Sequence, residues 1–302
     1  MKRFSIILFC MLLLSAASFA QTLTNAWTPL LTQDGRYFEK FIGIPHTSVA
    51  GLPDWNKGDG TTTGTPLGLN NDPLNVFKIE MTNGKPVLHV SGEIFGGYST
   101  KQDFGNYHLK AEVKFGDKKY EPRLADKRDN GFLYHGQAPH GQFWHVWYRA
   151  QEFQVQEGDM GDYYSLAGTA MDIHAQKADT ARRTRWMYDP AAPVHTFAST
   201  GAASTATIAR SGGNVAHLAG NFENPHGEWT TVELYCFGDK SIHVINGHVV
   251  MVLENSRTVL PDGTTKPLTS GKIQFQSEGA EAYYRNIEIK KLDKLPDLNT
   301  FK

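Results

Sequence analysis

Short segments of alternating apolar and polar residues recur along this chain between turn-forming residues, and long helical periodicity is absent. From residue 107 to residue 115 every second side chain is apolar, so one face of an extended segment would be buried. Gly238-Asp239 and Asn246-Gly247 mark tight turns between neighbouring segments. We therefore expect an all-β fold, an antiparallel β-sandwich or jelly roll. The expected strands are 87–90, 107–115, 131–135, 145–156, 230–237, 241–253, 273–276 and 283–289.

The first 20 residues have the pattern of a secretory signal peptide. Lys2 and Arg3 precede an apolar run over 4–14, and small residues flank Phe19 before the expected cleavage site. We expect export across the inner membrane, most simply to the periplasm, and a single domain over 21–302. The formal net charge of −1 argues against nucleic acid as a partner. No later apolar stretch reaches bilayer length, so we expect no membrane insertion.

Cysteine and glycine usage excludes several kinds of chemistry. Cys236 is the one cysteine outside the first 20 residues, so the exported chain cannot form an internal disulfide. It lies in an apolar run and is expected to be a buried structural thiol. No dinucleotide fingerprint, phosphate-binding loop or nucleophile elbow is present, so we expect no nucleotide cofactor.

Two segments interrupt the succession of strands. Residues 51–71 are rich in Gly, Thr, Asn and Asp and are expected to form a long surface loop. Residues 165–224 form a longer insertion with Arg182-Arg183, Trp186, three histidines and a small-residue tract over 199–213. We expect this insertion to be a partly ordered loop that folds over a groove.

The stretch 144–159, WHVWYRAQEFQVQEGD, concentrates aromatic, amide and carboxylate side chains. In a strand, Glu152, Gln154 and Gln156 would share one face while Phe153 and Val155 point to the core. His145, Trp147 and Arg149 form a second alternating set, and a bulge near 149–151 could separate its register from that of Glu152. Aromatic rings beside carboxylates and amides indicate a groove for carbohydrate. The alternative is an edge strand with polar outer positions.

Five ordered stretches resemble the DUF1080 family, also described as 3-keto-disaccharide hydrolases. They are SGEIFGGYSTKQDFGNYHLKAEVK at 91–114, DNGFLYHG at 129–136, EFQVQEGD at 152–159, GEWT at 227–230 with IHVING at 242–247, and GKIQFQSEGAEAYYRNIEI at 271–289. The resemblance implies a concanavalin/LamG-like jelly roll. The chain departs from the family pattern at Asn130, at His135 in place of an arginine, and at Glu278-Gly279.

The same resemblance implies a substrate sugar already oxidised at C3. A C3 ketone acidifies the C2 proton, so a base can form an enolate and the aglycone at C1 can leave by elimination, with water adding afterwards. We therefore expect a hydrolase or lyase for 3-keto-glycosides, with a small-molecule sugar or glycoside as its partner.

Glu152 matches the family's glutamate and is the first candidate, as general base or metal ligand. His135 and His145 are the other candidate catalytic residues, because imidazole titrates near neutral pH. We expect Gln154, Trp147, Arg149, Tyr134 and Gln276 to bind the substrate. Glu152, Glu157 and Asp159 could together hold one divalent metal ion.

Other interpretations of these residues remain open. Glu152 could be a carboxylate paired with Arg149, and His135 could be structural. The chain could also be a non-catalytic glycan-binding module with Trp144, Trp147 and Tyr148 as its platform. A conventional retaining glycosidase is a weaker alternative, because Gln154 and Gln156 stand where acids would be needed.

Overall fold

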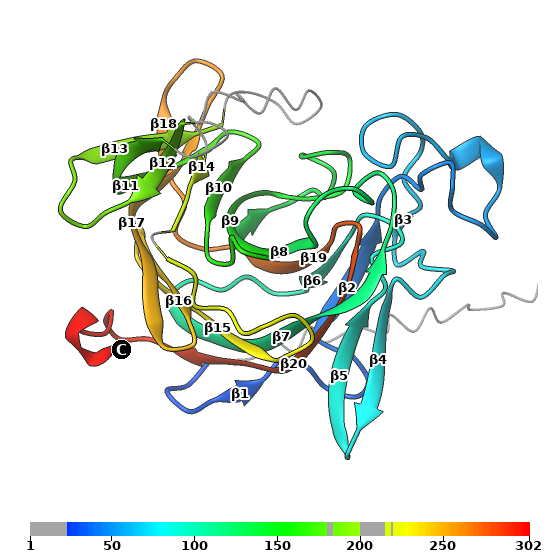
Figure 1. Cartoon of the computed structure of the whole chain (residues 1–302), viewed down its shortest axis with the longest axis horizontal. Helices are drawn as coiled ribbons and strands as arrows, with labels where there is room; N and C mark the ends of the chain where they lie inside the picture. The colour runs from blue at the N-terminus through cyan, green and yellow to red at the C-terminus, as the bar shows by residue number, and fades with distance from the viewer. Residues whose placement is uncertain (1–22, 180–183, 200–214, 219) are drawn as a thin grey trace, which may run out of the picture.

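The computed structural model describes residues 23–179, 184–199, 215–218 and 220–302, and the expected signal peptide over 1–20 lies outside them. In these ranges two antiparallel sheets face each other (Figure 1). The larger follows the order β12 (Thr184–Tyr188), β11 (Thr169–Asp179), β17 (His248–Val259), β16 (Lys240–Ile245), β15 (Thr230–Phe237), β7 (Tyr107–Lys119), β20 (Ala280–Lys291), β5 (Lys85–Val90) and β4 (Phe77–Thr82). Three short strands pair with members of this path: β1 (Thr28–Pro29) with β20, β13 (Val194–Ala198) with β11, and β18 (Thr265–Pro267) with β17.

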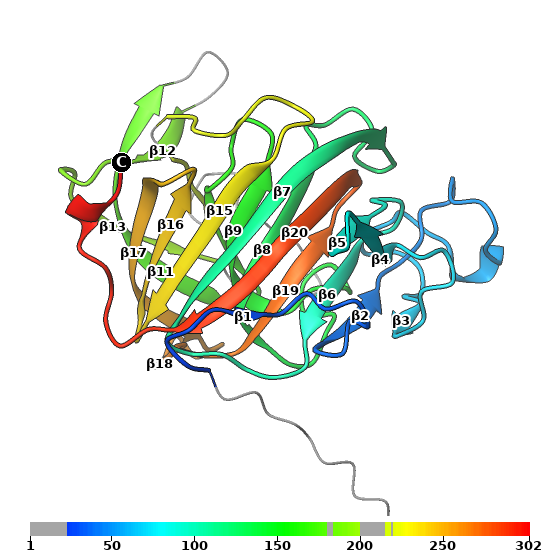
Figure 2. The same ribbon diagram turned by 90° about the horizontal axis from the view of Figure 1, so that it is seen from below.

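The smaller sheet has eight strands. Its order is β14 (Val215–Ala216), β10 (Tyr163–Leu166), β9 (Arg149–Gln156), β8 (Asp129–Gln137), β19 (Lys272–Ser277), β6 (Gly96–Thr100), β2 (Phe38–Ile42) and β3 (Gly68–Leu69). Figure 2 shows the long strands β15, β7 and β20 side by side across the larger sheet. The expected antiparallel jelly-roll sandwich is confirmed.

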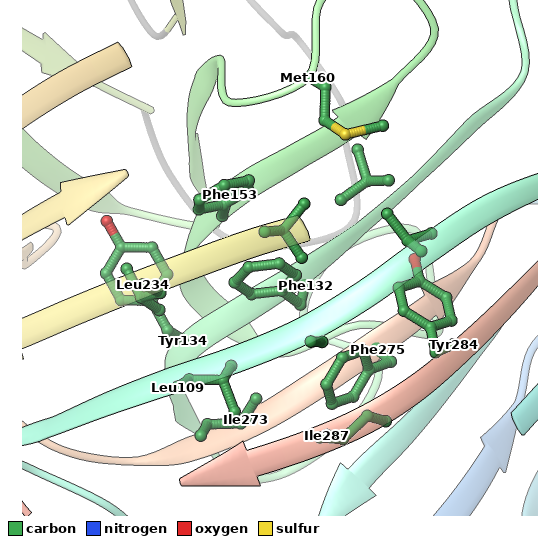
Figure 3. Close-up of a cluster of buried hydrophobic side chains, with 14 of the residues drawn as sticks. Leu109, Phe132, Tyr134, Phe153, Met160, Leu234, Ile273, Phe275, Tyr284 and Ile287 are labelled. Atoms are coloured by element: carbon green, nitrogen blue, oxygen red, sulfur yellow. The ribbon is translucent and has the colours of Figure 1, made fainter. Parts of the chain in front are cut away.

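The core lies between the two sheets and follows the alternation of the sequence. Phe132 and Phe153 of the smaller sheet stack with their ring centroids 4.4 Å apart. Phe275 of β19 meets Tyr284 of β20 edge to face across the gap, at 5.3 Å (Figure 3). Cys236 is also buried in this core, as expected, and its burial raises the pKa of its thiol. Aromatic burial of this extent is the main favourable term in the fold.

The opposite face of the smaller sheet is also covered. A second apolar cluster lies there, formed by Phe95, Leu133, Val146, Trp147, Tyr148, Ala150 and Leu166. The segment between β8 and β9 folds back over this face, because the Phe143 N–H donates to the Trp147 carbonyl (3.1 Å) and the Val146 N–H to the Phe143 carbonyl (3.1 Å). Consequently the strand expected from residue 145 begins only at Arg149, and His145 takes the left-handed value φ 55.

Most described residues of the insertion expected at 165–224 form strands rather than a loop, although Arg185 and His217 from it do line a cavity on the smaller sheet, as a segment folding over a groove would. Strand β11 pairs with β17, β12 and β13, and β14 pairs with β10. Met171, Ile173 and Ala175 alternate with more exposed residues, which is the pattern of a half-buried strand. Arg182-Arg183 and most of the tract 199–213 lie outside the described residues.

Residues 51–67 form most of the expected surface loop, with the short 3-10 helix η1 (Asp54–Asn56) inside it, and the expected loop ends in the short strand β3. A second 3-10 helix, η2 (Leu298–Thr300), precedes the C-terminal residues. None of the helices in the described ranges is long and apolar enough to cross a membrane.

Candidate active site

A cavity of about 460 Å³ opens on the face of the smaller sheet that is turned away from the core. Glu152 and Gln154 of β9 project into it, while Phe153 between them points to the core, as the alternation predicts. Gly131 of β8 leaves room beneath them. A Cβ at Gly131 would lie 2.8 Å from the Glu152 carboxyl and 2.2 Å from the Gln276 amide, so a larger residue here would push these two side chains aside.

One wall of the cavity carries two buried carboxyl groups, Glu152 and Glu278, with the guanidinium of Arg123 beside them. An Arg123 nitrogen lies 3.1 Å from Glu278 Oε1, and Arg123 also forms an ion pair with buried Asp129. Buried carboxylates are expensive unless they are paired or protonated. Arg123 therefore compensates Glu278 and Asp129 directly, and among the described residues Glu152 has no ion-pair partner.

The environment separates the protonation of the two glutamates. Burial, followed by the charge of Glu278, holds the pKa of Glu152 well above its usual value. Burial raises the pKa of Glu278 to about 7, against the attraction of Arg123. Of the two, Glu152 therefore holds its proton more strongly, and Glu278 titrates near neutral pH. Carboxyl groups with separated proton affinities are typical of acid–base catalytic sites.

Aromatic side chains form the second wall. Trp144 stacks on Phe143 with centroids 5.1 Å apart and on Phe95 at 6.0 Å, and it remains partly exposed. Trp147 also lines the cavity, but its side chain is buried and its Nε1–H donates to the Gly96 carbonyl (3.0 Å). The face available to a sugar is therefore better supplied by Trp144 than by Trp147.

A buried Asp–His pair borders the cavity, and the sequence did not single it out. His217, two residues after Val215 where β14 begins, lines the cavity, and its Nδ1 is hydrogen-bonded to Asp162. Asp162 also accepts the Leu218 N–H (2.8 Å). Burial raises the pKa of Asp162, and the hydrogen bond from His217 opposes that shift. An imidazole oriented by a buried carboxylate is suited to proton transfer or to stabilising negative charge.

Asp159, Asp162 and His217 are the three described side chains that could hold a metal ion, with one ligand atom each within 4.8 Å of the others. However, Asp159 already pairs with Lys127 (2.6 Å) and lies 3.6 Å from Arg185. The structure does not bring the expected set of Glu152, Glu157 and Asp159 together. Glu157 instead lines a separate hollow, where it pairs with Arg128 and His226.

Besides Glu157, three of the expected site residues lie away from the cavity. His135 lies inside the sandwich, with its ring edge-on to Tyr107 and Tyr134, and burial lowers its pKa to about 4. The Tyr134 hydroxyl contacts Ser241 (3.0 Å) between the sheets. Arg149 donates from Nε to the Ala167 carbonyl (2.7 Å) and is not a partner of Glu152.

Besides Asp159, three other expected residues line or adjoin the cavity, and His145 does not. Gln154 and Trp147 line it, and Gln276 adjoins Glu152 above Gly131. His145 lies in the turn before β9, outside the lining. Glu152 is thus the expected catalytic residue that the structure brings into the cavity, and Glu278, Arg123 and the Asp162–His217 pair are additions.

The fold and the cavity define a class of jelly-roll protein with a polar, aromatic-walled site on one sheet face. Residues 48–290 match the model of the 3-keto-alpha-glucoside-1,2-lyase-like domain, and the chain belongs to this family. Its function is accordingly carbohydrate-active. No curated protein is similar to this sequence at a significant level.

Solved structures with similar folds include two candidate glycosyl hydrolases from Parabacteroides distasonis. One is 18% identical over 77% of this chain and 88% of its own, with a TM-score of 0.39. The other is 15% identical over 89% and 100%, with a TM-score of 0.44. The carbohydrate-binding module CBM66 from Bacillus subtilis is 7% identical over 71% and 92%, with a TM-score of 0.41. At these values none of the three carries a functional argument.

Proposed function

We propose that this protein cleaves 3-keto-glycosides in the cavity by C2 proton abstraction, elimination and hydration. The observation that supports this proposal best is the placement of Glu152: a buried carboxyl group with a raised pKa, in a cavity with an aromatic second wall, within a family of lyase-like domains. A concave site of this size, in which aromatic rings face a few convergent polar groups, is of the kind that binds small ligands.

The proposed chemistry begins at C2 of the oxidised sugar. A base takes the C2 proton, and the electrons form an enolate with the C3 oxygen. The enolate then collapses: the C3 carbonyl and a C1–C2 double bond form while the C1–oxygen bond breaks, and the departing oxygen takes a proton. Water later adds at C1 and a proton returns to C2. Acid–base groups and a donor for the C3 oxygen are sufficient for these steps.

The residues of the cavity can supply each of these groups. Glu152 carries out one of the two proton transfers, at C2 or at the departing glycosidic oxygen. His217 lines the cavity with its Nδ1 hydrogen-bonded to Asp162, and in the doubly protonated form its Nε2–H can donate to the oxygen that becomes negative at C3. Trp144 supports the sugar face. Asp162 is a positioning residue, because it acts through His217.

The test compares sugar release from 3-keto-trehalose and 3-keto-lactose with release from the parent disaccharides. We expect release from the keto forms alone, and a loss of roughly 10³-fold in kcat for Glu152→Gln. Glu281→Gln is the matched control, because Glu281 is a carboxylate of β20 that pairs with His89 (3.1 Å) outside the cavity. Binding of glycans without release from any of these sugars would favour the non-catalytic module instead.

The mechanism assigns no step to a metal ion. We expect activity to survive exhaustive chelation, because Asp159, Asp162 and His217 already have protein partners. Loss of activity in EDTA and its recovery with one divalent ion would assign these three residues to a metal centre. The basic start of the chain and the apolar run over 4–14 support the accompanying proposal that the protein acts after export, in the periplasm.

A further inference from the structure

The turn between β19 and β20 places a second carboxyl group in the cavity that Glu152 lines. Glu278 lies in this turn, and its N–H donates to the Asn130 side-chain oxygen (3.0 Å). The same Asn130 amide donates to the Ala280 carbonyl (3.3 Å) on the far side of the turn. Asn130 is fully buried in β8, so one side chain fixes Glu278 relative to the strand that lies beside Glu152.

Arg123 distinguishes the two carboxyl groups from each other. It reaches Glu278 by passing over Gly279, which has φ 82. A Cβ at Gly279 would lie 2.8 Å from Arg123 Cβ, so a larger residue at this position would displace Arg123. The guanidinium therefore pairs with Glu278 and Asp129 but not with Glu152. As a consequence, one negative charge of the pair is best placed on Glu278 and one proton on Glu152.

We propose that Glu278 is a second catalytic residue: its carboxylate removes the C2 proton while the carboxylic acid of Glu152 protonates the departing glycosidic oxygen. This inference rests on the proposed function and assigns the base and the acid within it. Both side chains line the same cavity, with β8 lying between β9 and β19.

The proton count of the pair is conserved throughout the reaction. During elimination the C2 proton passes to Glu278 and the Glu152 proton passes to the leaving oxygen, so the pair still holds one proton. During hydration the Glu152 carboxylate takes a proton from the water that attacks C1, and Glu278 returns its proton to C2. The starting state is regenerated without any further acid, base, oxidant or reductant.

The charged and titratable groups around the pair support this assignment. Arg123 and Asp126 lie before β8, and Asp129 begins that strand. Across the cavity, Tyr164 of β10 remains neutral, because burial, with further contributions from nearby acids that include Glu152 and Glu278, raises its pKa. The active form has Glu278 ionised and Glu152 protonated. The rate should therefore rise as pH increases through about 7, where Glu278 loses its proton, and fall at higher pH, where Glu152 loses its own.

The deciding experiment follows the C2 proton of 3-keto-trehalose by NMR in deuterated buffer. In Glu152→Gln the C2 proton should still exchange with solvent although sugar release is lost, because Glu278 remains able to form the enolate. In Glu278→Gln both exchange and release should fall by roughly 10²-fold or more. A 3-keto-glycoside with a nitrophenyl leaving group needs no acid, so it should restore release in Glu152→Gln but not in Glu278→Gln.

A purely structural role for Glu278 would give different results. Added formate should restore C2 exchange in Glu278→Ala if a missing base is the cause, whereas a displaced Arg123 would not respond. Glu281→Gln should exchange at the wild-type rate. Exchange of the C2 proton at the wild-type rate in Glu278→Gln, or no recovery of exchange in Glu278→Ala with formate, would overturn the inference. The proposed function would stay intact as long as the wild type releases sugar from the keto substrate. Failure of the wild type to act on any keto sugar would remove the proposed function itself.

Discussion

Two clusters of acids and histidine lie near the end of strand β9, and their surroundings differ. The cavity cluster consists of Glu152, Glu278, Asp162 and His217, in which the carboxyl groups are buried. The rim cluster consists of Asp117, Glu157 and His226: His226 bridges Glu157 (2.8 Å) and Asp117 (3.1 Å) in the separate hollow. The Asp117 side chain is 95% exposed, whereas that of Asp162 is fully buried.

The two clusters show that residue type alone does not make a catalytic site. Each contains carboxylates hydrogen-bonded to an imidazole. In the rim cluster water solvates the charges, so the interactions are screened and contribute little. In the cavity cluster desolvation raises the pKa of Glu152 and makes each hydrogen bond matter more. Burial is therefore the property that we expect to separate the two clusters functionally.

The largest predicted contrast is between Asp162→Asn and Asp117→Asn. A neutral amide in place of the Asp162 carboxylate could not stabilise positive charge on His217, so the donor to the C3 oxygen would be weakened. We expect kcat on a 3-keto-disaccharide to fall roughly 10³-fold with KM little changed. Asp117→Asn should remain within about twofold of the wild type, because its contact with His226 is solvated. Steady-state kinetics on both variants, with circular dichroism to confirm folding, would show whether burial matters; equal effects would contradict the comparison.

The same contrast applies to the two tryptophans of the aromatic wall. Trp147→Ala should lower the free energy of unfolding by about 3 kcal/mol, because the ring is buried and its removal leaves a cavity. Trp144→Ala should cost about 1 kcal/mol of stability and raise KM about tenfold, because Trp144 presents the more exposed face to the sugar. Urea unfolding and steady-state kinetics separate the two effects. A larger rise in KM for Trp147→Ala would instead support the platform expected from the sequence.

The strands and the position of Glu152 could be predicted from the sequence because both depend on alternation within one strand. The same alternation places residues 131 and 133 on the cavity face of β8 and predicts His135 beside them. The register of β8 against β9 shifts between Tyr134 and Gln137, and His135 adopts φ 53. This irregularity directs the imidazole toward Tyr107 in the core. A single residue of shift reverses the face of a side chain, and no sequence pattern marks where it occurs.

The other cavity residues depend on contacts between distant parts of the chain. His217 meets Asp162 across 55 positions, through a two-residue pairing of β14 with β10 that is too short to leave an alternating pattern. Arg123 reaches Glu278 from a loop, past a glycine. Of these four residues, only Glu278 could be noticed in the sequence, as a departure from the family pattern. Such a departure indicates a changed environment, but it does not identify Arg123 as the residue that Glu278 pairs with.

The pH dependence of stability offers a smaller and independent test of the buried pair. The folded-state pKa of Glu152 is raised, so between its unfolded value and its folded value the folded protein retains a proton that the unfolded chain has lost. The free energy of unfolding should therefore decrease as pH rises through this window, by up to about 1.4 kcal/mol per pH unit for each such proton. Glu278 contributes in the same direction between its unfolded pKa and about 7.

Urea unfolding at pH 5, 7 and 9 should give a shallower decrease in the free energy of unfolding for Glu152→Gln than for the wild type. Glu281→Gln should keep the wild-type slope, because the pKa of Glu281 is lowered and this carboxylate is ionised in both states across that range. An unchanged slope in Glu152→Gln would mean that Glu152 is already ionised in the folded protein, and the distinction between the buried and the solvated cluster would lose its electrostatic basis.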